Sequence, residues 1–262
     1  MKDKLTESGI KGRLGFPCTV EVLDCTPSTN KEAADRMADG CAEFHTVIAR
    51  SQTGGEGRLG RSFFSPADTG IYMSTVLYPD TEDLGLITGM AAVAVCRAIE
   101  SISLSPRIKW VNDILIGNKK VCGILARSRT KNNKVGVILG IGINVYPPGG
   151  GFPEDITASA GYLAEKEETG LKDIICASVL NALYNVLEKE PRQDTLCAYR
   201  ERCDTVGRSI RVIPAGNTEN SRNGKALYID ESYRLVVEYD DGECTPLFSG
   251  EVSVRNNDDL HS

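Results

Sequence analysis

RIKWVNDILIGNKKVCGILAR, residues 107–127, holds two dense strand signals. Apolar and β-branched residues fill the runs Arg107 to Ile116 and Val121 to Arg127, and Gly117 with Asn118 stands near their junction. A glycine next to asparagine between two such runs is typical of a tight turn between antiparallel strands. We therefore predict a β-hairpin here.

Further strands and helices are predicted on both sides of this hairpin. The strand-like runs are Val20–Leu23, Thr46–Ala49, Ile71–Leu77 and Val135–Val145. The helical runs lie within residues 25–40 and over Leu86–Ile102, Leu171–Leu187 and Thr195–Arg202. Gly140 and Gly142 interrupt the last of these strands, which suggests the close approach of a ligand. Both chain ends are expected to fray.

After Cys203 the predicted elements change to short strand-like runs. These are Ser209–Ile213, Ala226–Ile229, Leu235–Tyr239 and Glu251–Arg255. Short strands at regular spacing are typical of a small β-rich unit. We predict one domain over residues 1–203 and a second, β-rich domain over residues 204–262.

Composition excludes several classes of function. The net charge is −6, which opposes attraction to a polyanion, so nucleic acid is not an expected partner. The nine cysteines form no CxxC pair, so they indicate reduced thiols in a cytoplasmic protein and no zinc site. The start of the chain lacks an apolar signal core, and the most apolar long segment, residues 84–104, contains Arg97 and Glu100. No membrane association is therefore expected.

The glycine-rich loop GGEGRLGR, residues 54–61, combines accessible backbone amides with Arg58 and Arg61. Such a loop suits an anion, and phosphate is the natural candidate. It lacks the Gly-Lys-Ser/Thr ending of a P-loop and the spacing of a dinucleotide fingerprint. By itself it is more typical of a mobile surface loop.

Three other polar clusters are ambiguous when each is taken alone. Asn112 and Asp113 lie among strand-forming residues with Lys120 just past a turn, but they could merely satisfy backbone groups. The triplet from Ser28 to Asn30 could be an ordinary helix N-cap. GIGIN, residues 140–144, could be only a strand of small residues.

Taken together and in order, these motifs resemble those of the biotin protein ligases. The matching stretches are STN at 28–30, QTGGEGRLGR at 52–61, KWVND at 109–113, KVCGIL at 120–125 and GIGIN at 140–144. GEVSVR at 250–255 is similar to the end of that family's small C-terminal domain. The joint match is specific, although no single stretch is.

The resemblance implies an α/β (α+β) fold, in which a mixed-sheet catalytic domain is followed by a small SH3-like β-barrel. It also implies a two-step reaction in which biotin and ATP form biotinyl-5′-adenylate. The biotinyl group then passes to a lysine of the biotin carboxyl carrier domain of a biotin-dependent carboxylase. Adenylation supplies a good leaving group to a carboxylate that would otherwise resist attack by an amine.

Site residues carried over by motif position fall into three groups. The resemblance places Ser28, Thr29, Asn30, Gln52, Gly57, Arg58 and Lys120 at biotin. It places Gly55, Glu56, Arg61, Phe63, Asn112, Asp113 and Asn144 at ATP or the adenylate. Catalytic roles are implied for Lys120, Arg58 and Asp113. Mg²⁺ is expected as the partner of the departing pyrophosphate, with its protein ligands unassigned.

The chain departs from the family pattern at three positions. Glu56 stands where the family carries a basic residue, Phe63 where it often carries tryptophan, and Val111 where it carries proline. Glu56 could face solvent, pair with an arginine or weaken retention of the adenylate. We hypothesise the pairing, because an unpaired carboxylate would repel phosphate at short range.

Two other functions compete with biotin ligation. One is a lipoate or octanoate ligase or transferase, which the resemblance implies would share the catalytic fold. The other is a non-catalytic, biotin-binding regulatory module. Because the STN triplet begins at residue 28, an N-terminal DNA-binding domain and a repressor role are not expected. The sequence leaves open whether the protein is a monomer or a homodimer.

Overall fold

A seven-stranded sheet forms the larger part of the protein. The computed structural model describes residues 3–79, 86–131, 134–213, 220–248 and 251–254. The strands are β1 (Val20–Leu23), β2 (Thr46–Ala49), β3 (Gly70–Leu77), β4 (Pro106–Lys109), β5 (Asp113–Ile116), β6 (Lys119–Lys131) and β7 (Lys134–Asn144). Their order is β1-β2-β3-β7-β6-β5-β4. Only the β1–β2 pair is parallel among these neighbours, so the predicted mixed sheet is confirmed.

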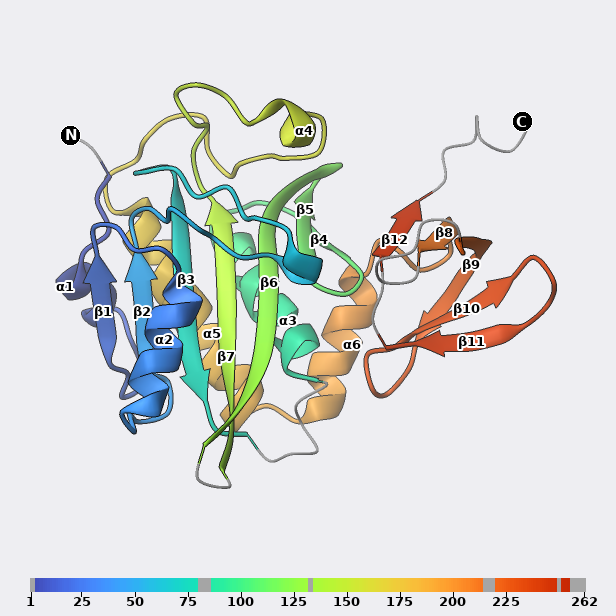
Figure 1. Cartoon of the computed structure of the whole chain (residues 1–262), viewed down its shortest axis with the longest axis horizontal. Coiled ribbons are helices and arrows are strands. Elements are labelled where there is room, and N and C mark those ends of the chain that lie inside the picture. Colours follow the sequence, from blue (N-terminus) through green and yellow to red (C-terminus); the bar gives the residue numbers. More distant parts are fainter. Residues whose placement is uncertain (1–2, 80–85, 132–133, 214–219, 249–250, 255–262) are drawn as a thin grey trace.

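Helices cover both faces of this sheet (Figure 1). On one face lies α2 (Thr29–Ala38), whose Ala33 and Met37 pack with Val47, Val76 and Ile138 of the strands. The other face carries the larger core. Its helices are α3 (Ile87–Glu100), α5 (Leu171–Glu188) and α6 (Arg192–Arg202). Shorter helices are α1 (Glu7–Lys11) and α4 (Glu154–Thr157).

A second sheet of five antiparallel strands follows α6 (Figure 1). Its strands are β8 (Ser209–Ile213), β9 (Arg222–Ile229), β10 (Leu235–Tyr239), β11 (Cys244–Leu247) and β12 (Glu251–Val254), in the order β11-β10-β9-β8-β12. The predicted small β-rich unit is therefore confirmed, while its boundary at residue 203 stays a prediction. Gly250 and Arg255 of the GEVSVR motif lie outside the described residues.

The turn between β9 and β10 fixes the second sheet against the first. Tyr233 in this turn is 4% exposed, and its ring packs edge-on against Tyr199 of α6 at a centroid distance of 5.0 Å. A Cβ atom on Gly89 of α3 would lie 2.2 Å from the Tyr233 ring, so only glycine leaves room for it. The Tyr233 carbonyl accepts a hydrogen bond from the Trp110 indole at 2.9 Å.

The run from Arg107 to Ile116 is not one strand, so that prediction is wrong. A turn over residues 110–112 splits it into β4 and β5, which pair with each other. Two hydrogen bonds tie Trp110 to the part of the chain that follows α6. Its backbone N–H donates to the Thr205 hydroxyl at 3.0 Å, and its indole N–H donates to the Tyr233 carbonyl. The Trp110–Val111 peptide bond is cis. By contrast, the turn predicted at Gly117 and Asn118 does join β5 to β6.

The N-terminal segment is packed from Asp3 onward, so the expected fraying at this end is wrong for the described residues. Leu5 and Ile10 are fully buried. The Asp3 carboxylate accepts hydrogen bonds from the backbone N–H groups of Gly170 (2.8 Å) and Lys172 (3.0 Å) and from the Tyr146 hydroxyl (2.8 Å). Asp3 therefore caps the first turn of α5, a role that its distance in sequence from α5 concealed.

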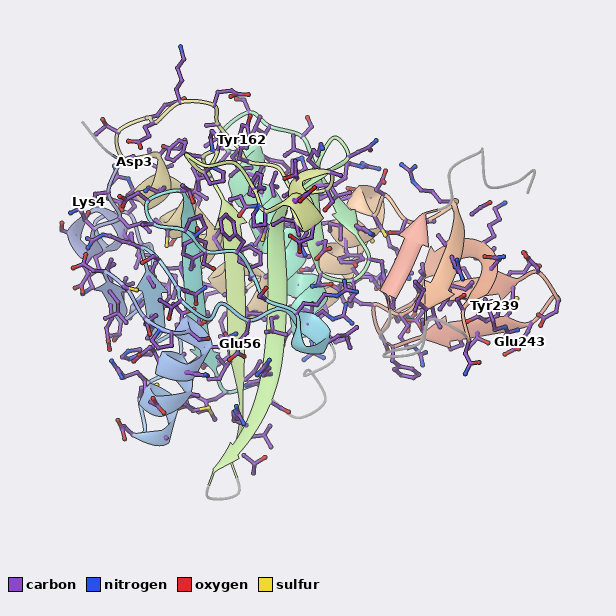
Figure 2. All side chains as sticks on the ribbon, turned by 45° about the horizontal axis from the view of Figure 1, so that its top comes forward. Asp3, Lys4, Glu56, Tyr162, Tyr239 and Glu243 are labelled. Atoms are coloured by element: carbon purple, nitrogen blue, oxygen red, sulfur yellow. The ribbon has the colours of Figure 1, made fainter. Side chains whose placement is uncertain are left out.

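We expect Asp3→Ala to lower the free energy of unfolding by about 2 kcal/mol, because three donors lose an acceptor that is itself buried. Urea denaturation followed by circular dichroism measures this change. The neighbouring Lys4, labelled with Asp3 in Figure 2, is exposed, and Lys4→Ala is the matched control. Equal midpoints for the two variants would show that the cap contributes nothing.

Candidate active site

A cavity of about 770 Å³ lies on the face of the large sheet that also carries α2. The glycine-rich loop crosses this face over β7 and β6 (Figure 1). Eleven of the sequence-predicted site residues line the cavity. They are Thr29, Asn30, Gln52, Glu56, Gly57, Arg58, Arg61, Phe63, Asn112, Asp113 and Lys120. Gly140 and Gly142 of GIGIN also line it, so folding brings all five motifs to one cavity.

The glycine-rich loop folds back on itself. The Gly57 N–H donates to the Arg61 carbonyl at 2.7 Å, and the Phe63 N–H donates to the Gly55 carbonyl at 2.9 Å. A single 3₁₀ turn, Arg58–Gly60, closes the tip, where Gly60 has a φ of 75°. A positive φ favours glycine at this position. The loop therefore carries Arg58 and Arg61 on a turn with its own backbone hydrogen bonds.

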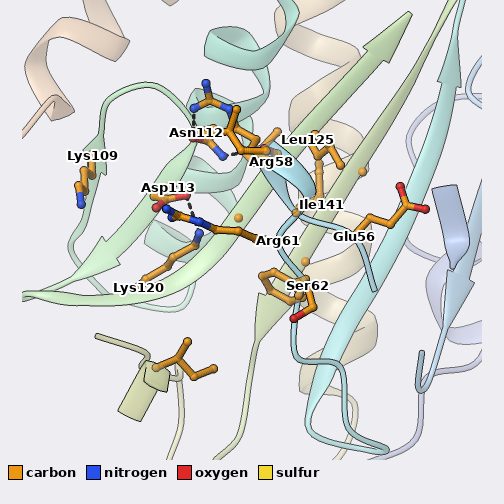
Figure 3. A pocket seen from close by; sticks show the side chains of 18 of the residues that line it. Glu56, Arg58, Arg61, Ser62, Lys109, Asn112, Asp113, Lys120, Leu125 and Ile141 are labelled. Atoms are coloured by element: carbon orange, nitrogen blue, oxygen red, sulfur yellow. Dashed lines mark hydrogen bonds and ion pairs between the residues drawn. The ribbon is translucent and has the colours of Figure 1, made fainter. Parts of the chain in front are cut away.

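Two cationic side chains are held at the cavity by polar residues of the KWVND stretch (Figure 3). The Arg58 guanidinium donates to the Asn112 side-chain oxygen at 2.9 Å, and the Asn112 amide donates to the Ile124 carbonyl at 2.8 Å. Lys120 Nζ lies 2.7 Å from Asp113 Oδ1. Because Asn112 is tied to β6 and Asp113 opens β5, both cations are oriented by the sheet. Such fixed cations can stabilise negative charge that develops on a substrate.

A hydrogen-bond network lies where α2 begins. The Gln52 side-chain oxygen accepts from the Thr29 backbone N–H at 2.8 Å, and the Gln52 amide donates to the Ser65 hydroxyl at 2.9 Å. The Ser74 hydroxyl oxygen lies 2.8 Å from both Thr29 Oγ1 and Asn30 Oδ1. Sequence reasoning missed the two serines, because an isolated serine in a strand or loop gives no signal.

Ser28 occupies the N-cap position of α2, but its side chain makes no capping hydrogen bond. The simple N-cap interpretation of the STN triplet is therefore wrong for this serine. Its Oγ is buried and has no hydrogen-bond partner among the described residues. A buried hydroxyl without a partner is costly, and such atoms occur at functional sites that await one.

The two interrupting glycines of β7 make room for side chains of the site itself. A Cβ atom on Gly140 would lie 2.5 Å from the Asn30 side-chain oxygen, and one on Gly142 would lie 2.5 Å from the Phe63 ring. Close approach at these glycines is thus made by Asn30 and Phe63, where a ligand had been expected. The glycines let both side chains lie flat against the sheet.

Three predicted site residues do not line the cavity. Ser28 is the N-cap residue of α2, next to the lining residue Thr29, and the Gly55 carbonyl accepts a hydrogen bond from the Phe63 N–H. The Asn144 amide donates to the Gly161 carbonyl at 3.0 Å, so it ties β7 to the following segment. Lining residues that were not assigned a role include Lys109, Trp110, Asp204 and Arg208. The last two follow Cys203, where no motif marked them.

The carboxylates that line the cavity all have cationic partners. Glu56 pairs with Arg127 at 2.7 Å, Asp113 with Lys120 at 2.7 Å, and Asp204 with Arg208 at 2.6 Å. Among the described residues no cluster of three or more His, Cys, Asp or Glu side chains could hold a metal ion. Within the same described part of the chain, no helix is long and apolar enough to cross a membrane.

Comparison with known proteins places these features in a family. The model of the biotin/lipoate A/B protein ligase family matches residues 22–144. The chain is 33% identical to the bifunctional ligase/repressor BirA of Bacillus spizizenii, over 96% of this chain and 79% of that protein. It is 28% identical to the biotin–[acetyl-CoA-carboxylase] ligase of Mycobacterium tuberculosis, over 96% and 93% of the two chains.

A solved structure agrees with the sequence comparison. The biotin protein ligase of Aquifex aeolicus, in complex with biotin and ATP, superposes with a TM-score of 0.73 at 25% identity. The superposition covers 91% of this chain and 99% of that one. The likeness therefore extends over both sheets.

Proposed function

The chain belongs to the biotin protein ligases of the biotin/lipoate A/B protein ligase family, and from this we infer that its cavity joins biotin to ATP. The products of the first step are biotinyl-5′-adenylate and pyrophosphate. In the second step a lysine amine of a carboxylase's biotin carboxyl carrier domain attacks the acyl carbon. The amide forms, and AMP leaves with the electron pair of the acyl–phosphate bond.

The observation that carries this proposal is the convergence of Arg58 and Lys120 on one cavity. Attack of a carboxylate on ATP, and of an amine on the adenylate, places negative charge on phosphate oxygens. Two oriented cations stabilise such charge more in a partly enclosed site than in water. We assign the stabilisation to Arg58 and Lys120. Asn112 and Asp113 then serve to hold them, through the contacts of 2.9 and 2.7 Å.

The network around Thr29 and Gln52 supports a biotin subsite. The ureido ring of biotin presents N–H donors and a carbonyl acceptor in a fixed arrangement, and a matching polar set can recognise it. We propose that Thr29, Asn30 and Gln52 meet this ring, with the unpartnered Ser28 hydroxyl supplying one bond. Gly57 would let the loop approach the valeryl chain.

The nucleotide is proposed to lie between the glycine-rich loop and the sheet. Arg61 and Phe63 line this part of the cavity, and Phe63 offers an aromatic surface. Gly55 shapes the loop from behind and Asn144 fixes the end of β7, so their roles are indirect.

Magnesium is proposed to enter as the counterion of ATP. The three lining carboxylates are already paired with cations, so the described residues do not form a cage for the ion. Mg²⁺ commonly keeps water and phosphate oxygens as most of its ligands.

Incubation with ATP, biotin and a biotin carboxyl carrier domain tests the function directly. We expect the mass of the carrier to rise by one biotinyl group, with no rise when lipoate or octanoate replaces biotin. Thermal stabilisation by biotin but not by lipoate is the matching binding test. Labelling by lipoate would favour the rival ligase or transferase, whereas biotin binding without labelling would favour a regulatory module.

A further inference from the structure

The ion pair between Glu56 and Arg127 joins the glycine-rich loop to strand β6. Glu56 Oε2 lies 2.7 Å from Arg127 Nη1, and the Glu56 side chain is 22% exposed. The two atoms do not align as a hydrogen bond, so charge holds them together. The hypothesis that Glu56 pairs with an arginine is thus confirmed in the structure.

Glu56 lies on the opposite side of the glycine-rich loop from Asp113 and Lys120 (Figure 3). Its side chain points away from Asp113 and Lys120, whereas Arg61 extends toward them and Arg58 extends toward Asn112. Glu56 also forms an isolated β-bridge with Ser62 across the loop. A restraint on Glu56 is therefore transmitted to the turn that carries both arginines.

Arg127 is well placed to anchor a movable segment. It belongs to the long strand β6, which pairs with β7 along its length, opposite Ile138 at this position. Leu125, two residues earlier and so on the same face of the strand, lines the cavity. The anchor thus lies on the ligand side of a rigid sheet, beyond the cavity itself.

We propose that the Glu56–Arg127 ion pair is a latch that keeps the glycine-rich loop closed over the adenylate, with Arg127 as a positioning residue. The role concerns retention of the intermediate and rests on the proposed ligase function. In this chain the attraction between the acidic Glu56 of the loop and Arg127 of β6 favours the closed loop. Pairing also neutralises a carboxylate that would otherwise repel the adenylate phosphate.

The test uses the full chain and three single variants, Arg127→Gln, Glu56→Gln and the control Arg129→Gln. Arg129 lies two residues further along β6 on the same face and is exposed. Two quantities are measured: the rate at which biotinyl-adenylate leaves the enzyme, and hydrogen–deuterium exchange of residues 54–63 in the ligand-free protein. The second readout does not depend on catalysis.

Both latch variants are expected to release the adenylate about 2-fold to 5-fold faster than wild type, the range for a solvent-accessible ion pair. Exchange in residues 54–63 is expected to rise in both, and Arg129→Gln is expected to match wild type. The double variant Glu56→Gln/Arg127→Gln is expected to release no faster than either single variant. Exchanging the charges, in Glu56→Arg/Arg127→Glu, is expected to restore retention relative to Arg127→Glu alone.

The variants also distinguish the latch from an alternative in which Arg127 only neutralises the negative charge of Glu56. Faster release in Arg127→Gln together with normal release and exchange in Glu56→Gln would overturn the latch. Additive effects in the double variant, or wild-type exchange in both single variants, would overturn it as well. If wild type makes no adenylate, the ligase function fails instead, and the exchange measurement still decides whether the pair closes the loop.

Discussion

Replacing Lys120 with alanine is expected to lower the rate of carrier biotinylation by about 10²-fold to 10³-fold, the typical effect of removing one preorganised group that stabilises transition-state charge. Lys120 lines the cavity and is held by Asp113 at 2.7 Å. Its removal deletes a cation and also takes from the Asp113 carboxylate the ammonium group that it contacts at 2.7 Å. Both changes raise the barrier. Single-turnover transfer of biotin to the carrier measures the loss.

The adjacent lysine provides the control for this prediction. Lys119 starts β6 beside Lys120, but it does not line the cavity, and its ammonium group donates to the Ala158 carbonyl at 2.7 Å. Lys119→Ala is expected to retain nearly full activity. Because Lys120 is half-buried on a hairpin, its loss should change the melting temperature little. Normal transfer by folded Lys120→Ala would remove Lys120 from the mechanism.

Tyr233→Ala is expected to lower the free energy of unfolding by about 3–5 kcal/mol, the usual cost of truncating a buried aromatic residue. The Tyr233 ring fills the space above Gly89 and contacts Tyr199, so truncation leaves a cavity at the junction of the two sheets. Chemical denaturation measures the loss. The effect is expected to reach the site, because Trp110 is bonded to the same turn.

Tyr233→Phe separates the ring from its hydroxyl group. The Tyr233 hydroxyl is buried and has no hydrogen-bond partner among the described residues. Removing an unsatisfied buried donor relieves a desolvation cost, so Tyr233→Phe is expected to be as stable as wild type or more stable. A loss as large as that of Tyr233→Ala would assign the stability to the hydroxyl group instead.

Local patterns predicted most of the secondary structure. The predicted strands Val20–Leu23, Thr46–Ala49 and Leu235–Tyr239 coincide with β1, β2 and β10. The turn at Gly117 was predicted because glycine beside asparagine is itself the turn signal. The sequence patterns did not predict the break within one strand-like run or the shortest elements. β4 and β5 look like one strand in the sequence, and α1 and β11 (Cys244–Leu247) are too short to show a period.

The amino-acid sequence by itself determined which residue types the site would contain, because each motif places its polar groups within a few positions of one another. Only the tertiary structure decided their partners. Glu56 was expected to meet an arginine, but folding selected Arg127, and folding alone joined Trp110 to Thr205. The physical reason is that a buried polar or charged group must find a complement, yet which complement lies within reach depends on how distant segments pack.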